Sequence, residues 1–226
     1  MRTEQTLPLV VTQPGARTAL STNRVLRNTY GLLSATLFFS AAVTAASAAL
    51  KVPHPGIVLT LLGFFGLLYA TTKLRNSAWG LAAVFGLTGF MGYTLGPIVS
   101  HYLSMPNGHQ VVMMAMGGTA TIFVGLSFYA LTSRKDFSFM GGFLLAGIIV
   151  AFLAGLGAIF FQVPALSLTV SAVFVLLMGG LILFETSRIV HGGETNYIMA
   201  TVSLYVSIYN LFSSLLALIG FGRSDE

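Results

Sequence analysis

Long runs without a charged side chain dominate this sequence and restrict its fold more than any other feature. The long intervals that contain no Asp, Glu, Lys or Arg include 28–50, 52–72, 76–133, 137–184 and 195–222. About 20 consecutive apolar residues are enough to span a bilayer as an α-helix. Each interval can therefore hold one or two spans, and the chain is predicted to be an all-α, polytopic membrane protein.

The interval 137–184 shows how the longer runs divide. As one straight helix it would be about 72 Å long, more than twice the hydrocarbon thickness of a bilayer, so it must double back. Pro164 marks the turning point, because proline lacks an N–H and disfavours helix at the preceding Val163. Applied to the whole chain, this reasoning predicts seven transmembrane helices, at 29–50, 56–72, 78–100, 111–132, 137–161, 165–184 and 197–220. The connections are short, so consecutive helices should be antiparallel neighbours.

Composition narrows the function as well as the fold. Charged residues make up 8% of the chain and cysteine is absent, which excludes disulfides, thiol catalysis and thiolate metal sites. The net charge of +5 is better explained in a membrane protein by orientation and anionic lipid than by nucleic acid. Walker, GxSxG and HExxH motifs are also absent. We therefore predict no enzyme, no cofactor and no metal site, with the lipid bilayer as the first partner.

Basic residues predict the orientation. With the N-terminus in the cytoplasm, nine of the eleven Lys and Arg residues fall in cytoplasmic segments, and only Lys51 and Arg223 lie outside. The positive-inside rule then predicts an inside N-terminus and an outside C-terminus. The expected organisation is a flexible cytoplasmic tail (1–28), a seven-helix transmembrane domain (29–221) and a short C-terminal tail (222–226).

Small and polar residues at helical spacing predict how the spans pack. Lipid gives helices no hydrophobic reason to associate, so such residues form the close contacts. Close contacts are expected in the third span at Gly86, Gly89, Gly92 and Gly96, in the fifth at Gly147, Ala151 and Gly155, and in the first at Thr36, Ser40, Thr44 and Ser47.

A polar stripe in the last span is the most informative of these patterns. Ser203, Ser207, Asn210 and Ser214 share one helix face. An Asn210 amide facing lipid would be costly, so this face should turn inward and the last helix should lie near the centre of the bundle. The stripe is then either a packing surface between helices or part of a polar pathway.

Glu185 is the candidate working acid. It follows the apolar run at the predicted end of the sixth span, where a carboxylate faces the negative end of the helix dipole. Arg188, three residues later, can pair with it. Two interpretations stay open: an interfacial ion pair that fixes the depth of the helix, and a proton-responsive gate facing the polar stripe. His191 and Glu194 flank two glycines that suit a helix stop, and their spacing matches no zinc motif.

The C-terminal third, LFETSRIVHGGETNYIMATVSLYVSIYNLFSSLLALIGFG, resembles the Bax inhibitor family of transmembrane Bax-inhibitor-motif proteins. The pattern ATVSLYVSIYNLF is its most specific part, and from VLRNTY at Val25 onward the chain looks closest to the bacterial YccA-like branch. The resemblance implies seven helices with the last one central, in a bacterial inner membrane.

Two functions follow from the resemblance. The family is associated with a pH-sensitive calcium leak, attributed to an acid at the end of span six and a second acid in span seven. Glu185 stands at the first position and Ser207 at the second, so the acid pair is incomplete. The YccA-like branch instead implies a non-enzymatic modulator and substrate of FtsH, a membrane-anchored AAA+ protease. The polar N-terminal tail would suit such an unfoldase as a handle. We take the FtsH modulator as the main hypothesis and a calcium or cation leak, with Glu185 as its proton sensor, as the alternative.

Overall fold

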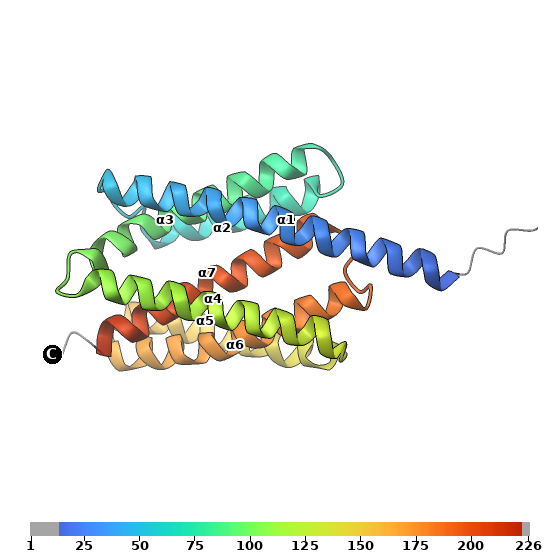
Figure 1. Ribbon diagram of the computed structural model, residues 1–226. Helices are drawn as coiled ribbons and strands as arrows, with labels where there is room; N and C mark the ends of the chain where they lie inside the picture. The colour runs from blue at the N-terminus through green and yellow to red at the C-terminus, as the bar shows by residue number, and fades with distance from the viewer. Residues whose placement is uncertain (1–13, 223–226) are drawn as a thin grey trace, which may run out of the picture.

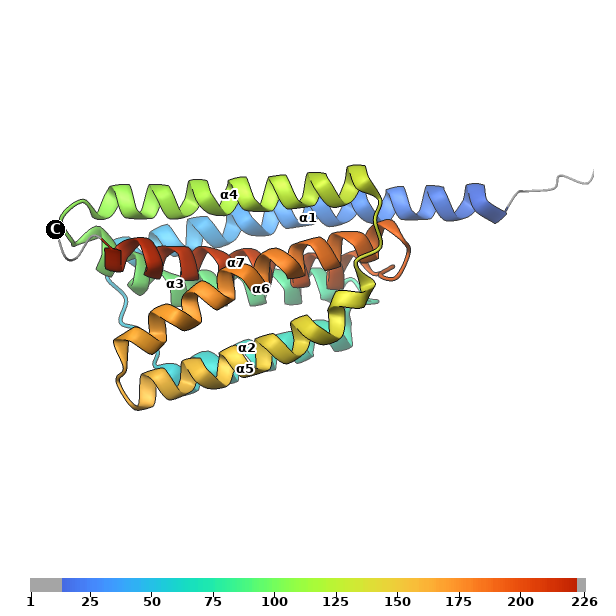
Figure 2. The same cartoon turned by 90° about the horizontal axis from the view of Figure 1, so that it is seen from below.

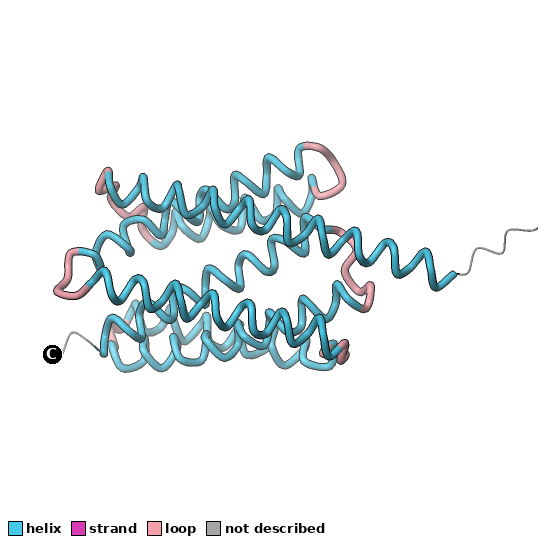
Figure 3. The backbone as a smooth tube through the Cα atoms, viewed as in Figure 1, coloured by secondary structure: helices cyan, strands magenta, loops and turns pink. Residues whose placement is uncertain are grey.

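Helices account for all the regular structure in the described part of the chain, residues 14–222 of this computed structural model (Figure 1, Figure 3). Seven of them are long and apolar enough to cross a membrane, which confirms the predicted fold class. The helices are α1 (Pro14–Ala49), α2 (Ile57–Leu74), α3 (Trp79–Leu103), α4 (Gly108–Ser133), the short 3-10 helix η1 (Ser138–Met140), α5 (Gly141–Phe160), α6 (Pro164–Val190) and α7 (Tyr197–Gly222).

The turn between α5 and α6 lies where the sequence predicted it. Helix α5 ends at Phe160, Val163 has extended backbone angles, and Pro164 opens α6. A proline at the first helical position loses no hydrogen bond, because that N–H has no partner inside the helix.

Several predicted boundaries differ from the structure. Helix α1 begins at Pro14, so residues 14–28, expected as flexible tail, are helical and extend past the other helices (Figure 1). No proline interrupts the chain between Pro14 and Pro53. Residues 1–13 of the predicted tail lie outside the described residues. Helix α6 continues to Val190 instead of ending at 184, and α7 includes Gly222.

The bundle has three layers, seen edge-on in Figure 2. Helices α1 and α4 form one layer, α3, α7 and α6 the middle layer, and α2 and α5 the third (Figure 1, Figure 2). Helix α7 packs against α1, α3, α4 and α6, which makes it the central helix. Helix α2 packs on α3, whereas α5 packs on α6.

The tightest packing is between α1 and α3. A Cβ atom on Gly92 would lie 2.5 Å from the Ser40 carbonyl oxygen, and one on Gly96 would collide with the Ser47 side chain. Thr44 donates hydrogen bonds to the carbonyls of Ser40 (2.8 Å) and Gly92 (3.0 Å). The close contact predicted from these glycines is therefore confirmed, as is the buried polar face of α1 that they meet.

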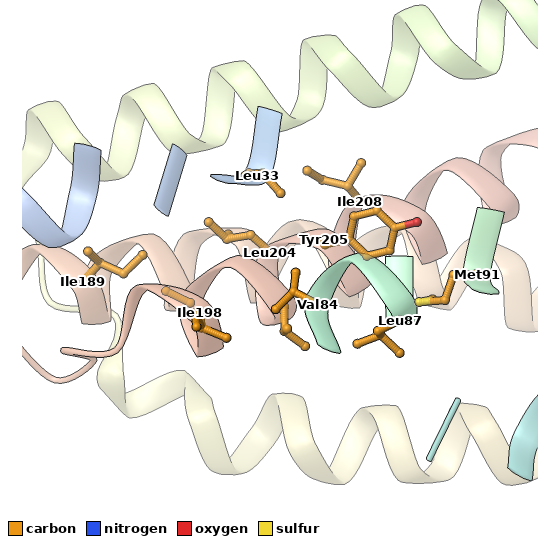
Figure 4. Close-up of a cluster of buried hydrophobic side chains, with 11 residues drawn as sticks. Leu33, Val84, Leu87, Met91, Ile189, Ile198, Leu204, Tyr205 and Ile208 are labelled. Carbon is orange, nitrogen blue, oxygen red and sulfur yellow. The ribbon is translucent and has the colours of Figure 1, made fainter. Parts of the chain in front are cut away.

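The largest apolar cluster surrounds the first half of α7 (Figure 4). It joins Leu33 of α1, Val84 and Leu87 of α3, and Ile189 of α6 to α7. Within a bilayer such a cluster stabilises the fold through close packing, because lipid tails are as apolar as the side chains themselves.

Candidate functional site

Glu185 lies inside α6, five residues before the helix ends at Val190, and not at the helix end predicted for it. Only 6% of its surface is exposed. Its Oε2 atom is 3.6 Å from Nη1 of Arg188, one helical turn later on the same face. That oxygen accepts no hydrogen bond within the described residues. The ion pair is thus confirmed, whereas the expected position at the helix end is wrong, because α6 runs on to Val190.

Arg188 connects α6 to the segment that leads into α7. Its Nη2 atom is 3.8 Å from Oε2 of Glu194 and donates to the carbonyl oxygen of Gly193 at 3.3 Å. Its guanidinium carbon also lies 5.5 Å from the ring centre of Phe184. One arginine therefore pairs with two carboxylates, of which Glu185 is the more deeply buried.

Asn196 organises the start of α7. Its Oδ1 accepts hydrogen bonds from the backbone N–H groups of Ile198 (3.0 Å) and Met199 (3.1 Å), the role of a helix N-cap. Its Nδ2 donates to Arg75 O (3.1 Å) and Asn76 Oδ1 (2.9 Å) in the α2–α3 connection. The sequence analysis missed this residue, although an asparagine just before an apolar run is a recognisable helix start.

Glu194 completes this link. Its Oε1 accepts a hydrogen bond from the Asn196 N–H at 2.8 Å. The chain of contacts from Glu185 through Arg188 and Glu194 to Asn196 therefore joins α6, the α6–α7 connection and the α2–α3 connection.

Ser187 of α6 and His191, the residue directly after α6, hold the α4–α5 connection. The Ser187 hydroxyl donates to Lys135 O (3.1 Å) and accepts from the Phe137 N–H (3.0 Å). His191 places Nε2 at 3.0 Å from Arg134 O and Nδ1 at 2.9 Å from Ser187 O. In the same connection, hydrogen bonds from Ser138 lower the pKa of the Asp136 carboxyl, and nearby His191 lowers it further.

The stripe predicted on α7 bonds mainly within its own helix. The Ser207 hydroxyl, fully buried, donates to Ser203 O at 2.9 Å, and Asn210 Nδ2 donates to Val206 O at 2.8 Å. Ser214 is buried as well. Among the described interactions, no hydrogen bond or ion pair joins Ser207 to Glu185, so the structure pairs Glu185 with Arg188 alone.

Tyrosines, which the sequence analysis overlooked, supply the polar links between α7 and its neighbours. The Tyr205 hydroxyl donates to Thr88 O of α3 at 3.2 Å and accepts from the Ser40 hydroxyl of α1 at 2.5 Å. The Tyr209 hydroxyl lies 3.2 Å from Thr94 Oγ1 of α3. The hydroxyl of a buried tyrosine usually forms a hydrogen bond, so tyrosines in a central helix could have been predicted to link it to its neighbours.

The arrangement is suited to holding helices and connections together rather than to covalent chemistry. The three connections that it ties lie at the same end of the bundle, the end from which α1 projects (Figure 1). A change in the charge of Glu185 would act directly on Arg188, and through Arg188 on the segment leading into the central helix.

Comparison with protein families and curated proteins gives a consistent result. The family model described as "Inhibitor of apoptosis-promoting Bax1" matches residues 22–224. A Pseudomonas aeruginosa protein of uncharacterised function is 56% identical over 202 residues, covering 89% of this chain and 91% of its own length.

Two Escherichia coli relatives carry informative names. The protein of strain K12 named "Modulator of FtsH protease YccA" is 55% identical over 217 residues, which cover 96% of this chain and 99% of the relative. The protein of strain O6:H1 named "Inner membrane protein YccA" matches with the same identity and coverage.

Proposed function

Because this chain belongs to the Bax inhibitor family and is a multi-pass protein of the bacterial inner membrane, we propose that it modulates a membrane-anchored protease of the FtsH type. The observation that carries the proposal is the 55% identity to the modulator YccA over 99% of that protein's length. Similarity of this extent covers every helix of the bundle, so it is a likeness of the whole molecule. We propose further that the protein acts by binding and not as an enzyme.

The site fits a binding role. Its charged residues are engaged with one another and with the connections, and they fix the geometry of one end of the bundle. A rigid end of this kind can present a constant surface to a partner that is anchored in the same membrane.

We also propose that this end faces the cytoplasm. The end from which α1 projects carries seven basic residues with described side chains, and the opposite end carries Lys51 (Figure 1). The seven are Arg24, Arg27, Lys73, Arg75, Arg134, Lys135 and Arg188. Lys and Arg accumulate on the cytoplasmic side of inner-membrane proteins. The cytoplasmic ATPase part of an AAA+ protease would then meet the N-terminal segment.

The experiment measures protease activity on a substrate other than this chain. In cells that contain an FtsH-type protease, the half-life of an independent membrane substrate is followed by pulse-chase with and without expression of this protein. We expect the half-life to change on expression and the protein to co-purify with a proteolytically inactive form of the protease.

The N-terminal segment supplies the matched variant. Replacement of residues 2–13 by a Gly/Ser segment of equal length keeps the tail but removes its sequence, whereas deletion of residues 2–13 removes the handle. We expect deletion to lengthen the half-life of the protein itself more than replacement does. An unchanged substrate half-life together with an absence of co-purification would contradict the proposed function.

The cation leak is the lesser candidate. A proton can be shared between two carboxylates only when they lie close together, so a pH-sensitive pair would need a second carboxylate near Glu185. In this chain, the position that the resemblance assigns to the second acid is Ser207, which bonds within its own helix. The other carboxylate in the cluster, Glu194, is separated from Glu185 by the Arg188 that pairs with both.

A further inference from the structure

One face of the central helix is only partly covered by its neighbours. Between Ile198 and Ile208, every residue is buried except Met199, Ser203 and Val206. The same face continues with the half-buried Asn210, Ser213 and Ala217. Spacings of three and four residues place all six on one side of α7. We call these six residues the open stripe of α7.

The open stripe lies on the side of α7 that faces the third layer. Helices α1, α3, α4 and α6 pack directly against α7, whereas α2 packs on α3 and α5 packs on α6. Figure 2 shows α2 and α5 in the same layer, and Figure 1 shows them on opposite sides of α7. The inward-facing stripe predicted from the sequence is therefore only partly enclosed: Ser207 and Ser214 are buried, but Ser203 and Asn210 are half-exposed.

Polar groups in the open stripe have unused hydrogen-bonding capacity. The Ser213 Oγ atom is buried and has no hydrogen-bond partner in the described part of the chain. Asn210 uses one N–H on Val206 O, and no described hydrogen bond reaches its amide oxygen. The Ser213 hydroxyl is enclosed by the protein, but Asn210 is partly exposed. Acyl chains offer neither donors nor acceptors, so lipid alone would leave the Asn210 amide oxygen unpaired at a cost.

A cavity continues the open stripe at its C-terminal end. It has a volume of about 470 Å³ and is lined by Ala217 of α7, Tyr102 of α3, Gln162 of the α5–α6 turn and Ser167 of α6, among mostly apolar side chains. An apolar lining does not favour a continuous column of water. The hollow lies where the α3–α4 and α5–α6 connections meet the end of the bundle, and it leaves room beside the last turns of α7.

We propose that the open stripe of α7 binds one transmembrane helix of another membrane protein. The contact face of that helix would carry small residues with at least one hydroxyl or amide group, since these allow close approach and interhelical hydrogen bonds. From Ser203 to Ala217 the stripe extends about 21 Å along α7, at 1.5 Å per residue, which is most of the hydrocarbon thickness. A lipid headgroup stays at the surface, so only a spanning element reaches all the polar positions.

Flanking helices favour a single helix over a second copy of the chain. Helices α2 and α5 present bulky side chains to lipid, such as Phe65 on α2 and Phe143 on α5. In the third layer they lie on opposite sides of α7, so the side of another seven-helix bundle would meet α2 and α5 before it reached the stripe (Figure 1, Figure 2). This inference goes beyond the proposed function and holds whichever membrane protein supplies the helix.

The test uses photo-crosslinking in living cells. A benzophenone amino acid replaces Met199 or Val206 in the open stripe, and Ile149 on the lipid-facing side of α5 serves as the matched control position. Adducts are mapped by mass spectrometry to the crosslinked peptide. We expect Met199 and Val206 to give adducts with a transmembrane peptide of another protein, whose contact face has the small and polar residues described, at several times the yield from Ile149.

Variants of the open stripe decide whether the contact is specific. Loss of an interhelical hydrogen bond in a membrane should lower occupancy by about three- to tenfold. We therefore expect Asn210→Leu to reduce the Val206 adduct by such a factor and Ile149→Leu to leave it unchanged. Ser203→Leu keeps the Asn210 amide but places a bulky side chain in the stripe. We expect it to reduce the yield of the Val206 adduct as well. Size-exclusion chromatography shows that each variant is folded.

Adducts with a second copy of this chain, adducts with lipid only, or stripe yields equal to that of Ile149 would each overturn the inference. The proposed function has a separate readout, the half-life of the protease substrate. A stripe that binds a helix while that half-life is unaffected would leave the inference standing and remove the proposed function. A changed substrate half-life without adducts between the stripe and a transmembrane helix would support the proposed function and overturn the inference.

Discussion

The side chain of Tyr205 links three helices. Its hydroxyl joins α7 to Thr88 O of α3 and to the Ser40 hydroxyl of α1, and only 2% of the residue is exposed. Tyr205→Phe keeps the ring but removes the hydrogen-bond partner of the buried Ser40 hydroxyl, and the Thr88 carbonyl keeps only its bond within α3. We expect the free energy of unfolding to fall by about 1–3 kcal/mol, measured by reversible unfolding in mixed micelles.

Tyr69→Phe is the matched control for that measurement. Its side chain is 65% exposed on α2, so removal of its hydroxyl should leave the free energy of unfolding nearly unchanged. Equal losses in the two variants would mean that the Tyr205 hydrogen bonds contribute nothing specific.

Sequence reasoning at single residues identified the right side chains more often than their partners. Glu185 and Arg188 do pair, and Ser40 and Thr44 do face α3. Ser207, however, bonds to the carbonyl four residues earlier in its own helix. A serine or threonine hydroxyl in a helix can bond either to that carbonyl or to a group on a neighbouring helix. The spacing of residues in the sequence does not show which acceptor it uses.

Helix α6 shows why element ends were harder to predict than elements. The sequence predicted an end at 184, because charged residues begin at Glu185. The helix continues because Glu185 pairs with Arg188, while Thr186, Ser187 and Ile189 are buried. The better signal was the glycine pair after His191, since Gly192 has a φ of +75° that ends the helix.

Gly192 and Gly193 give an internal comparison at this helix end. A side chain at Gly192 would be held in the left-handed region, which costs a non-glycine residue roughly 1–2 kcal/mol. A Cβ on Gly193 would meet its nearest neighbour, Arg188 O, at an ordinary distance of 3.5 Å. We expect Gly192→Ala to lower the thermal midpoint of the purified protein more than Gly193→Ala does. Indistinguishable midpoints would show that the strain is relieved by movement of the α6–α7 connection.

At the scale of the whole molecule, the sequence predicted the number of helices and the central place of α7, but not the partly exposed side of α7. Hydrophobic runs and short connections determine how many spans there are and that consecutive spans are antiparallel. Which helices cover a given face depends on pairings such as α1 with α3 and α4 with α7, which join segments far apart in the chain. Those pairings leave α2 and α5 on opposite sides of α7 (Figure 1).

The orientation of the whole molecule can be tested because the natural sequence contains no cysteine. Single-cysteine variants therefore report one position each. Ser77→Cys lies in the exposed α2–α3 connection, at the basic end of the bundle, and His109→Cys lies exposed at the start of α4, at the opposite end. Because basic residues are retained in the cytoplasm, the Ser77 end should be inside. We expect a membrane-impermeant maleimide to label His109→Cys in intact spheroplasts, and Ser77→Cys only after lysis. Labelling of Ser77→Cys before lysis would show that the molecule has the opposite orientation. The Glu185–Arg188 pair would then lie on the periplasmic side, where a cytoplasmic ATPase could not reach it.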